Sequence, residues 1–143
     1  MPDTDPVLRP INAPAQALVR LRISGWLRQN RCRAKKSNTP ITIALSEVTE
    51  IYKHFEYKCA YCGEAAGSPD HPFPIKTGNL CVPANILPCC DGCRSKKKGR
   101  DVVQFHRDGY VSKEQLRAII RYMLERQGGD RIRDYIKEAY SSK

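Results

Sequence analysis

Two pairs of cysteines with the same internal spacing constrain this chain more than any other feature of its sequence. The pairs are Cys59 with Cys62 and Cys90 with Cys93, and 27 residues lie between them. Two thiolates at this spacing reach one ion through a tight turn, and two such pairs complete the tetrahedral sulfur shell of Zn²⁺. A closed shell leaves no position for water, so the sequence predicts a structural zinc site. Cys89 is the alternative to Cys90 as a ligand, and the repeated spacing favours Cys90.

The number and setting of the cysteines favour metal binding over disulfide bonds. The chain has seven cysteines, an odd number that internal disulfides cannot use up. Its N-terminus is acidic and then interrupted by prolines, unlike a signal peptide, so we expect a cytoplasmic protein with reduced thiols. No apolar run approaches the roughly 20 residues of a membrane span, and we expect no membrane partner. Cys32 and Cys81 lack a partner at ligand spacing and are interpreted as packing residues.

The charge balance indicates a polyanionic partner, of which nucleic acid is the commonest. Among 143 residues the chain has 25 Lys and Arg against 15 Asp and Glu, a net charge of +10. The cations are concentrated in residues 20–36, which contain no acid, and in residues 94–100. A charged segment can simply be exposed to solvent, but we expect both of these segments to contact DNA phosphates. The candidate DNA-binding residues are Arg28, Arg31, Arg33, Arg94, Lys96, Lys97, Lys98 and Arg100.

The N-terminal part is predicted to divide into an arm and a basic extension. Prolines recur at every fourth position of residues 1–14, so this segment is predicted to be a flexible arm. Residues 15–45 are predicted to form a basic helical extension with a short helix that begins at Ala15 and is interrupted by Gly25. The side chains expected on one side of that helix are Leu18, Leu21 and Trp26.

A further helix is predicted just before the cysteine-rich segment. Ser46 precedes a helical apolar pattern and is expected to cap a helix over residues 46–57. The segment that follows is rich in Gly, Pro and Asn, which is typical of loops. We expect residues 46–101 to form the zinc-containing core.

The C-terminal part is predicted to be helical and to support that core. Ser112 and Gln115 resemble a capping box, which predicts a helix over residues 113–127. A last helix is predicted over residues 130–140. The apolar positions of both helices follow the helical period, so we interpret residues 102–143 as a packed helical region.

The segment between the cysteine pairs resembles a known family of nucleases. Three motifs, C-x2-C-G at residues 59–63, D-H-x-x-P-x-x-x-G at residues 70–78 and a final stretch at residues 85–93, follow one another. Their order and spacing are similar to those of the HNH, or ββα-metal, endonucleases over roughly residues 47–101. The resemblance implies an α+β fold: a small ββα-metal core with zinc-bound cysteine knuckles, flanked by N- and C-terminal helices.

The residues of these motifs suit phosphodiester hydrolysis. An imidazole titrates near neutral pH, so His71 is the candidate general base that activates water. Asp70 is the candidate oxygen ligand of a catalytic Mg²⁺ or Mn²⁺ ion that takes up the charge of the leaving oxygen. The resemblance implies that Asn85 orients the histidine through hydrogen bonds. Because adjacent residues of a regular strand point to opposite faces, Asp70 and His71 require an irregular strand, which the nearby prolines favour.

One position departs from the pattern of the family. The residue after the last zinc cysteine is usually Asn or His, a second metal ligand, but here it is Arg94, which has no lone pair for a metal. Three interpretations stay open at this point. In the first, Asp70, phosphate oxygens and water hold the metal with help from another side chain, for which the candidates are Asp91, Asp101 and His106. In the second, Arg94 grips the scissile phosphate as a catalytic cation. In the third, the protein binds DNA and barely cuts it.

The sequence thus leads to one expected function and two alternatives. We expect a bacterial or phage-encoded, metal-dependent endonuclease that cuts or nicks duplex DNA through water activated by His71. The alternative is a zinc-stabilised DNA-binding protein on a degenerate HNH scaffold. A zinc-containing adaptor for other proteins is a third class, which the positive charge disfavours. A homodimer is compatible with double-strand cutting.

Overall fold

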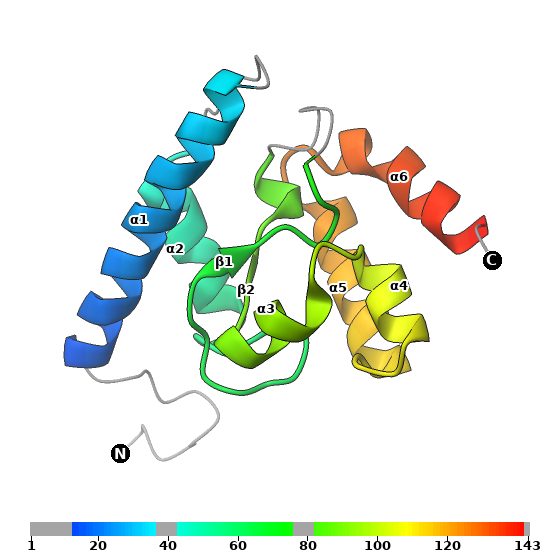
Figure 1. The fold of residues 1–143 in the computed structure, drawn as a ribbon, viewed down its shortest axis with the longest axis horizontal. Helices are drawn as coiled ribbons and strands as arrows, with labels where there is room; N and C mark the ends of the chain where they lie inside the picture. Colours follow the sequence, from blue (N-terminus) through cyan, green and yellow to red (C-terminus); the bar gives the residue numbers. More distant parts are fainter. Residues whose placement is uncertain (1–12, 37–42, 76–81, 142–143) are drawn as a thin grey trace.

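The fold combines helices at both ends of the chain with a small sheet in the middle. The computed structural model describes residues 13–36, 43–75 and 82–141. Figure 1 shows α1 and α2 along one flank, α4, α5 and α6 along the other, and the sheet with α3 between them. The elements in chain order are α1 (Ala13–Lys36), α2 (Leu45–His54), β1 (Pro69–Asp70), the 3₁₀ turn η2 (Pro83–Asn85), β2 (Leu87–Pro88), α3 (Asp91–Lys97), α4 (Val102–Arg107), α5 (Lys113–Glu125) and α6 (Gly129–Ser141).

Helix α1 is longer than expected and buries a different face. It runs for 24 residues and passes through Gly25 without a break, so the predicted interruption is wrong. Leu18 and Leu21 are 64% and 69% exposed, which contradicts their predicted place on a packed side. The helix contacts α2 instead through a stripe with a spacing of four residues, which keeps its members on one face. The buried members are Val19, Ile23 and Leu27. Of the predicted arm, residues 1–12 lie outside the described residues.

Helix α2 positions the segment that leads to the zinc cysteines. Its N-cap is Ala44, not the predicted Ser46, and the Glu47 carboxylate accepts a hydrogen bond of 2.9 Å from the Ala44 N–H. This side chain satisfies one of the amide donors that every helix leaves unpaired at its start. The face that packs inward consists of Val48, Ile51 and Tyr52. The chain turns at the end of the helix through positive φ angles at Glu56 and Tyr57.

The sheet is a short antiparallel pair that brings the two cysteine-rich stretches together. In β1 and β2, Pro69 pairs with Pro88 and Asp70 pairs with Leu87. The strands are short because proline cannot donate to the ladder. Gly67 N–H extends the pairing with a 2.8 Å bond to the Cys89 carbonyl. Helix α3 begins three residues after β2, so the sheet sets where α3 starts.

The C-terminal helices pack on this centre. The Ser112 hydroxyl accepts a 3.1 Å bond from the Gln115 N–H, which confirms the predicted cap of α5. The turn between α5 and α6 rests on η2, where the Ala84 N–H donates to the Gln127 carbonyl at 3.1 Å. Gly128 has φ +90°, and a Cβ there would lie 2.5 Å from that of Val82, so this close approach requires glycine.

The helix-rich fold with its two-stranded antiparallel sheet is compatible with the predicted α+β class. Helices α5 and α6 lie within two residues of their predicted bounds. A buried core runs from α1 to α6 without a break into separate clusters. In the described part of the chain, no helix is both long and apolar enough to cross a bilayer.

Candidate zinc centre and adjoining polar site

The four predicted ligands converge on one point. The sulfur atoms of Cys59, Cys62, Cys90 and Cys93 all lie within 4.8 Å of one another, and those of Cys62 and Cys90 are 3.6 Å apart. This arrangement can hold one zinc ion in a tetrahedral sulfur shell. Cys90 belongs to the cluster and Cys89 does not, so Cys90 is the candidate ligand of the two. Cys81 and the side chain of Cys32 lie outside the described residues.

Local backbone geometry makes both knuckles. In the first, the Gly63 N–H donates to the Cys59 carbonyl at 2.9 Å and the Cys59 N–H to the Glu64 carbonyl at 2.6 Å. Gly63 has φ +84°, a region that favours glycine and allows the tight return. In the second, Cys90 is the N-cap of α3, and its sulfur accepts a 3.3 Å bond from the Cys93 N–H. The start of a helix thus presents the second pair.

The thiols of the cluster oppose one another's ionisation. A hydrogen bond from the Cys89 thiol, helped by nearby backbone amides, lowers the pKa of Cys59 to about 4. Burial raises the pKa of the Cys93 thiol, and the neighbouring Cys59 thiolate raises it further. Burial likewise raises the pKa of Cys62. One thiolate therefore opposes ionisation of the others, and a divalent ion that prefers sulfur removes the conflict.

Three side chains from α2 and α3 fix the segment that carries Asp70 and His71. Tyr52 donates its hydroxyl proton to the Gly67 carbonyl at 2.7 Å. Arg94 donates from Nη2 to the Ser68 carbonyl at 2.9 Å and also to the Pro69 carbonyl. Lys97 donates from Nζ to the His71 carbonyl at 3.0 Å. The backbone before and at the candidate base is therefore held from one side by two cations of one helix.

Asp70 faces a buried lysine. Its Oδ2 accepts from the Tyr61 hydroxyl at 2.8 Å and lies 3.2 Å from Nζ of Lys97. The side chains of Lys97 and Asp70 are only 3% and 16% exposed. Burial raises the pKa of Tyr61 well above its ordinary value, and the adjacent Asp70 charge adds to the effect, so Tyr61 remains a hydrogen-bond donor. The chain thus supplies its own positive charge to this carboxylate.

His71 is held in one orientation. Its Nδ1 lies 2.8 Å from the Asn85 carbonyl oxygen, so in the neutral ring Nδ1 carries the proton and Nε2 carries the lone pair. The Asn85 side chain is fixed in turn, because its amide bonds the N–H and the carbonyl of Phe73 at 3.0 and 2.8 Å. The Trp26 ring of α1 lies 4.9 Å from the His71 ring, centroid to centroid. His71 is 9% exposed.

The residues around Asp70 do not form a resident Mg²⁺ site by themselves. Among the described residues, the one group of three or more possible ligands is the four-cysteine cluster. The Asp91 carboxylate binds Arg22 at 2.7 Å, and the Asp101 carboxylate caps α4 through a 2.8 Å bond from the Gln104 N–H. Nδ1 of His106 lies 2.6 Å from the Val111 carbonyl oxygen. Each of the three proposed replacement ligands thus has a structural partner.

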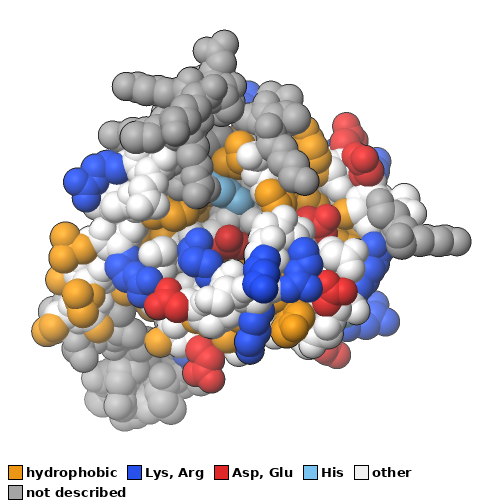
Figure 2. Space-filling model, in the orientation of Figure 1, with side chains coloured by type: hydrophobic (Ala, Val, Ile, Leu, Met, Phe, Trp, Pro, Cys, Tyr) orange, Lys and Arg blue, Asp and Glu red, His pale blue; other side chains and the backbone are white. Residues whose placement is uncertain are grey.

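The candidate DNA-binding cations differ in their availability. Lys96, Lys98 and Arg28 are exposed, whereas Lys97 is buried against Asp70. Arg100 pairs with Asp108 at 2.5 Å and donates to the Lys97 carbonyl at 3.0 Å. Figure 2 shows Lys and Arg side chains gathered across the middle of one face, with carboxylates between them. Arg31 and Arg33 lie in the part of α1 whose side chains are outside the described residues.

Several residues of the site were not recognised in the sequence. They are Tyr52, Tyr61, Arg22, Trp26 and, as a buried partner of Asp70, Lys97. One available signal was the helical period: Arg94 and Lys97 are three residues apart, so once α3 begins at the second knuckle they must share a face. The contact between Trp26 and His71 joins segments far apart in sequence and has no local signal.

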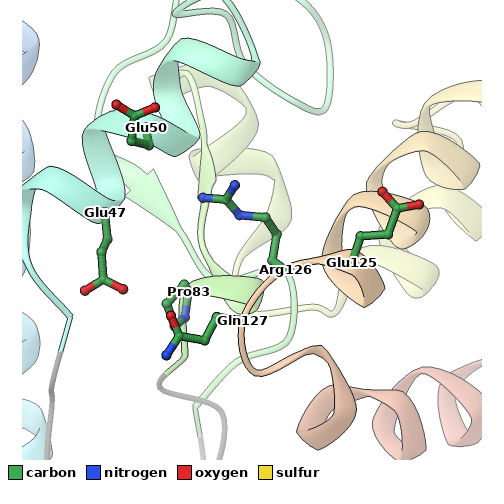
Figure 3. Close-up of a pocket in the computed structure, with 6 residues that line it drawn as sticks. All are labelled: Glu47, Glu50, Pro83, Glu125, Arg126 and Gln127. Atoms are coloured by element: carbon green, nitrogen blue, oxygen red, sulfur yellow. The ribbon is translucent and has the colours of Figure 1, made fainter.

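A hollow of about 380 Å³ lies between α2, η2 and the α5–α6 turn (Figure 3). Figure 3 shows Arg126 reaching from this turn toward α2, and its guanidinium lies 5.0 Å from the centroid of the Tyr122 ring. The carboxylates in the lining outnumber this cation, so the hollow does not suit a polyanion. They belong to Glu47, Glu50 and Glu125.

Comparison of the chain with models of protein families, with curated proteins and with solved structures finds no match. The features of this chain that bear on its function are the four-cysteine cluster and the polar site around Asp70 and His71.

Proposed function

We propose that this protein is a DNA endonuclease of the HNH kind, which hydrolyses phosphodiester bonds and nicks or cuts duplex DNA. The observation that carries the proposal is the fixed orientation of His71, with Nδ1 against the Asn85 carbonyl oxygen at 2.8 Å. In the neutral ring held in this way the lone pair is on Nε2, which is the atom that can act as a general base. The zinc cluster serves as the scaffold on which this histidine is positioned.

The proposed reaction begins with a water molecule next to Nε2 of His71. As the water attacks phosphorus, its proton passes to Nε2, and the imidazolium is stabilised by its hydrogen bond from Nδ1 to the Asn85 carbonyl. The P–O bond on the opposite side breaks, and the leaving oxygen takes a proton from solvent. Asn85 acts here as a positioning residue, because its side chain is committed to Phe73.

Lys97 and Arg94 support this step through the backbone of residues 68–71. Their bonds to the carbonyls of Ser68, Pro69 and His71 hold the base in place and bring positive charge to the site. Positive charge near a phosphate stabilises the negative charge that develops in the transition state. The proposed catalytic Mg²⁺ or Mn²⁺ ion is implied only by the resemblance to HNH endonucleases. A cleavage assay without divalent ions tests whether the reaction needs it.

DNA is the proposed substrate because of the overall charge and of the exposed cations beside the site. The net charge is +10, and Lys96 and Lys98 project from the same short helix region as Lys97. Each phosphate contact made by such residues releases counterions. Binding is therefore expected to weaken steeply as the salt concentration rises.

The test is incubation of the purified protein with supercoiled plasmid in three buffers, with Mg²⁺, with Mn²⁺ and without a divalent ion. We expect nicked or linear plasmid from the wild type and a loss of at least about a hundredfold in rate for His71→Ala, the usual effect of removing a general base. The control is His54→Ala, which removes an exposed histidine whose ring contacts that of Tyr122. This variant is expected to cut like the wild type.

Two outcomes would contradict parts of the proposal. Cutting by His71→Ala at the wild-type rate would remove His71 as the base. Equal cutting with and without divalent ions would show that the reaction needs no metal. The charge of the transition state would then be stabilised by the protein's own cations.

One observation favours a second candidate function. Asp70 is already neutralised by Lys97, and Arg94 is committed to backbone carbonyls, so both residues have structural roles. The second candidate is a zinc-stabilised DNA-binding protein on a degenerate HNH scaffold, with little or no cleavage. A protein that retards DNA in a gel but leaves plasmid supercoiled in all three buffers would support this candidate.

A further inference from the structure

A hollow of about 350 Å³ lies beside His71, between α1 and the start of α3. Its size falls within the range of about 300–1,000 Å³ that is usual for small-ligand sites. One wall is a single face of α1, because the residues it contributes are spaced as i, i+3, i+4 and i+7. They are Arg22, Gly25, Trp26 and Gln29, and the opposite wall consists of Ser68, Asp91 and Arg94.

The hollow has the charge of an anion site. Two guanidinium groups and one carboxylate line it, which leaves an excess of one positive charge. The bonds of Arg22 to Ser68 and Asp91 use Nε and Nη2, and those of Arg94 use Nη2. Within the described residues, Nη1 of both groups therefore remains for a ligand. Guanidinium groups bind phosphate oxygens in a fixed, often bidentate geometry.

Trp26 connects the hollow to the candidate base. Its ring lines the hollow and also lies 4.9 Å from the ring of His71. Aromatic side chains bind unpaired bases by stacking, whatever the base. The amide of Gln29 adds a donor and an acceptor for the edge of a base. A base stacked on Trp26 would thus lie against a side chain that itself contacts His71.

Gly25 keeps the hollow open. A Cβ at this position would meet no atom within 4 Å, so the space beside the helix backbone is empty where any other residue would project. Glycine inside a helix costs about 1 kcal/mol relative to alanine in helix propensity, and no packing requires it here. The middle of α1 thus leaves this side of the hollow without a side chain.

We propose that this hollow binds one unstacked nucleotide of a DNA strand, with its phosphate at Arg22 and Arg94 and its base against Trp26. The inference rests on the proposed function and deepens it by naming the substrate class. Bases of intact duplex DNA are stacked on one another, so they reach the hollow only after unstacking. The preferred substrate is therefore DNA with an unpaired nucleotide next to the cleaved bond, as in a single strand, a gap or a mismatch.

The test uses the fluorescence of Trp26, the one tryptophan of the chain. The probe is a 5′-phosphorylated tetrathymidylate, and a blunt-ended DNA duplex without unpaired nucleotides is the comparison. We expect the tetrathymidylate to quench Trp26 and to protect it from acrylamide, because a stacked base covers the ring. The duplex is expected to quench weakly at the same concentration. Absence of both quenching and protection by the tetrathymidylate in the wild type would overturn the proposal.

Variants locate the binding in the hollow. Gly25→Leu fills the empty space with a good helix former and is expected to weaken tetrathymidylate binding by about tenfold or more. Ala17→Leu adds the same side chain at an exposed position of α1 outside the hollow and is expected to bind like the wild type. Equal affinity of Gly25→Leu and the wild type, with helix content unchanged by circular dichroism, would also refute the proposed site.

The two proposals fail in different ways. Plasmid nicking without an effect of tetrathymidylate on Trp26 refutes the nucleotide site and leaves the nuclease. Quenching that Gly25→Leu weakens, in a protein that never nicks DNA, supports the nucleotide site and refutes the nuclease.

Discussion

The four-cysteine cluster and the Asp70–Lys97 pair lie in the same cysteine-rich core, and they differ in the source of the charge that can neutralise them. In the cluster, the four sulfur atoms lie within 4.8 Å of one another, an arrangement that can hold a zinc ion taken up from solution. At Asp70, Lys97 supplies the charge from within the chain at 3.2 Å. We therefore expect the cluster to make folding depend on a metal, and the Asp70–Lys97 pair to make it depend on one side chain. The pair also places a cation where the resemblance implies a divalent ion.

The largest expected loss of stability comes from removing one ligand of the proposed zinc site. Cys90→Ser removes one ligand and leaves an incomplete shell, and structural zinc contributes roughly 10–16 kcal/mol to the folding of small domains. Since whole domains are stable by only about 5–15 kcal/mol, we expect this variant to lose both its metal and its cooperative unfolding transition. Metal analysis of the purified protein and a thermal melt followed by circular dichroism measure the two effects.

The matched control for this variant is the adjacent cysteine. Cys89 is fully buried but is not a ligand, so Cys89→Ala is expected to keep the zinc and to lose only about 1–2 kcal/mol from the lost packing. Wild-type protein with far less than one zinc per chain, or a Cys90→Ser variant that melts like the wild type, would refute a structural zinc site.

The next largest effect is expected from breaking the buried pair of Asp70 and Lys97. Lys97→Met keeps most of the side-chain volume but leaves the Asp70 carboxylate without its cation, which is expected to lower the free energy of unfolding by about 3–5 kcal/mol. Asp70→Asn should be costly as well, because the ammonium then lacks a counter-charge. Urea unfolding of both variants and of the double variant measures the coupling.

The double variant decides whether the pair acts as a unit. Asp70→Asn with Lys97→Met removes both charges, so its loss of stability is expected to be smaller than the sum of the two single losses. Additive losses would mean that the two side chains do not interact, and the contrast with the zinc centre would then disappear.

The difference between the two regions also explains what the sequence could predict. The zinc ligands are recognisable because their geometry is local: each pair is one tight turn, and only the meeting of the two pairs needs the fold. Helices α5 and α6 were also predictable from local sequence, because the caps, the turns and the period of the apolar residues all indicate the same helix bounds. The burial of Lys97 is different. Nothing in residues 96–98 distinguishes the middle lysine from its neighbours. The distinction appears only when α3 begins at Asp91, because the helix start determines which of these side chains faces inward.

Long-range contacts account for the failed and missing predictions. Leu18 and Leu21 looked like the packed side of α1, but α2 accepts the stripe at Val19, Ile23 and Leu27 instead. Gly25 is a helix breaker by propensity alone, yet α1 continues through it because packing on both sides outweighs a loss of about 1 kcal/mol. The bonds of Arg94 to backbone carbonyls were not predicted, because they depend on the position of β1.

The smallest expected effect concerns a third pair of opposite charges, at the surface. Arg100 lies 2.5 Å from the Asp108 carboxylate, and the Gln104 amide donates to the same carboxylate at 2.9 Å. These hydrogen bonds, chiefly the one from Arg100, lower the pKa of Asp108. A lowered pKa in the folded protein means that the pair stabilises the fold above the ordinary aspartate pKa of about 4. That contribution is lost as the pH falls through the lowered pKa.

This surface pair sharpens the contrast with Asp70 because water and salt screen it. We expect Arg100→Ala to bring the pKa of Asp108 back toward its ordinary value, and Gln104→Ala to raise it less, because Arg100 is the larger cause. An NMR titration of the Asp108 carboxyl carbon measures both shifts. A wild-type pKa at or above the ordinary value, or a larger shift in Gln104→Ala, would contradict this assignment. Lys97→Met should in any case destabilise the protein far more than Arg100→Ala, since burial removes the solvent that screens the surface pair.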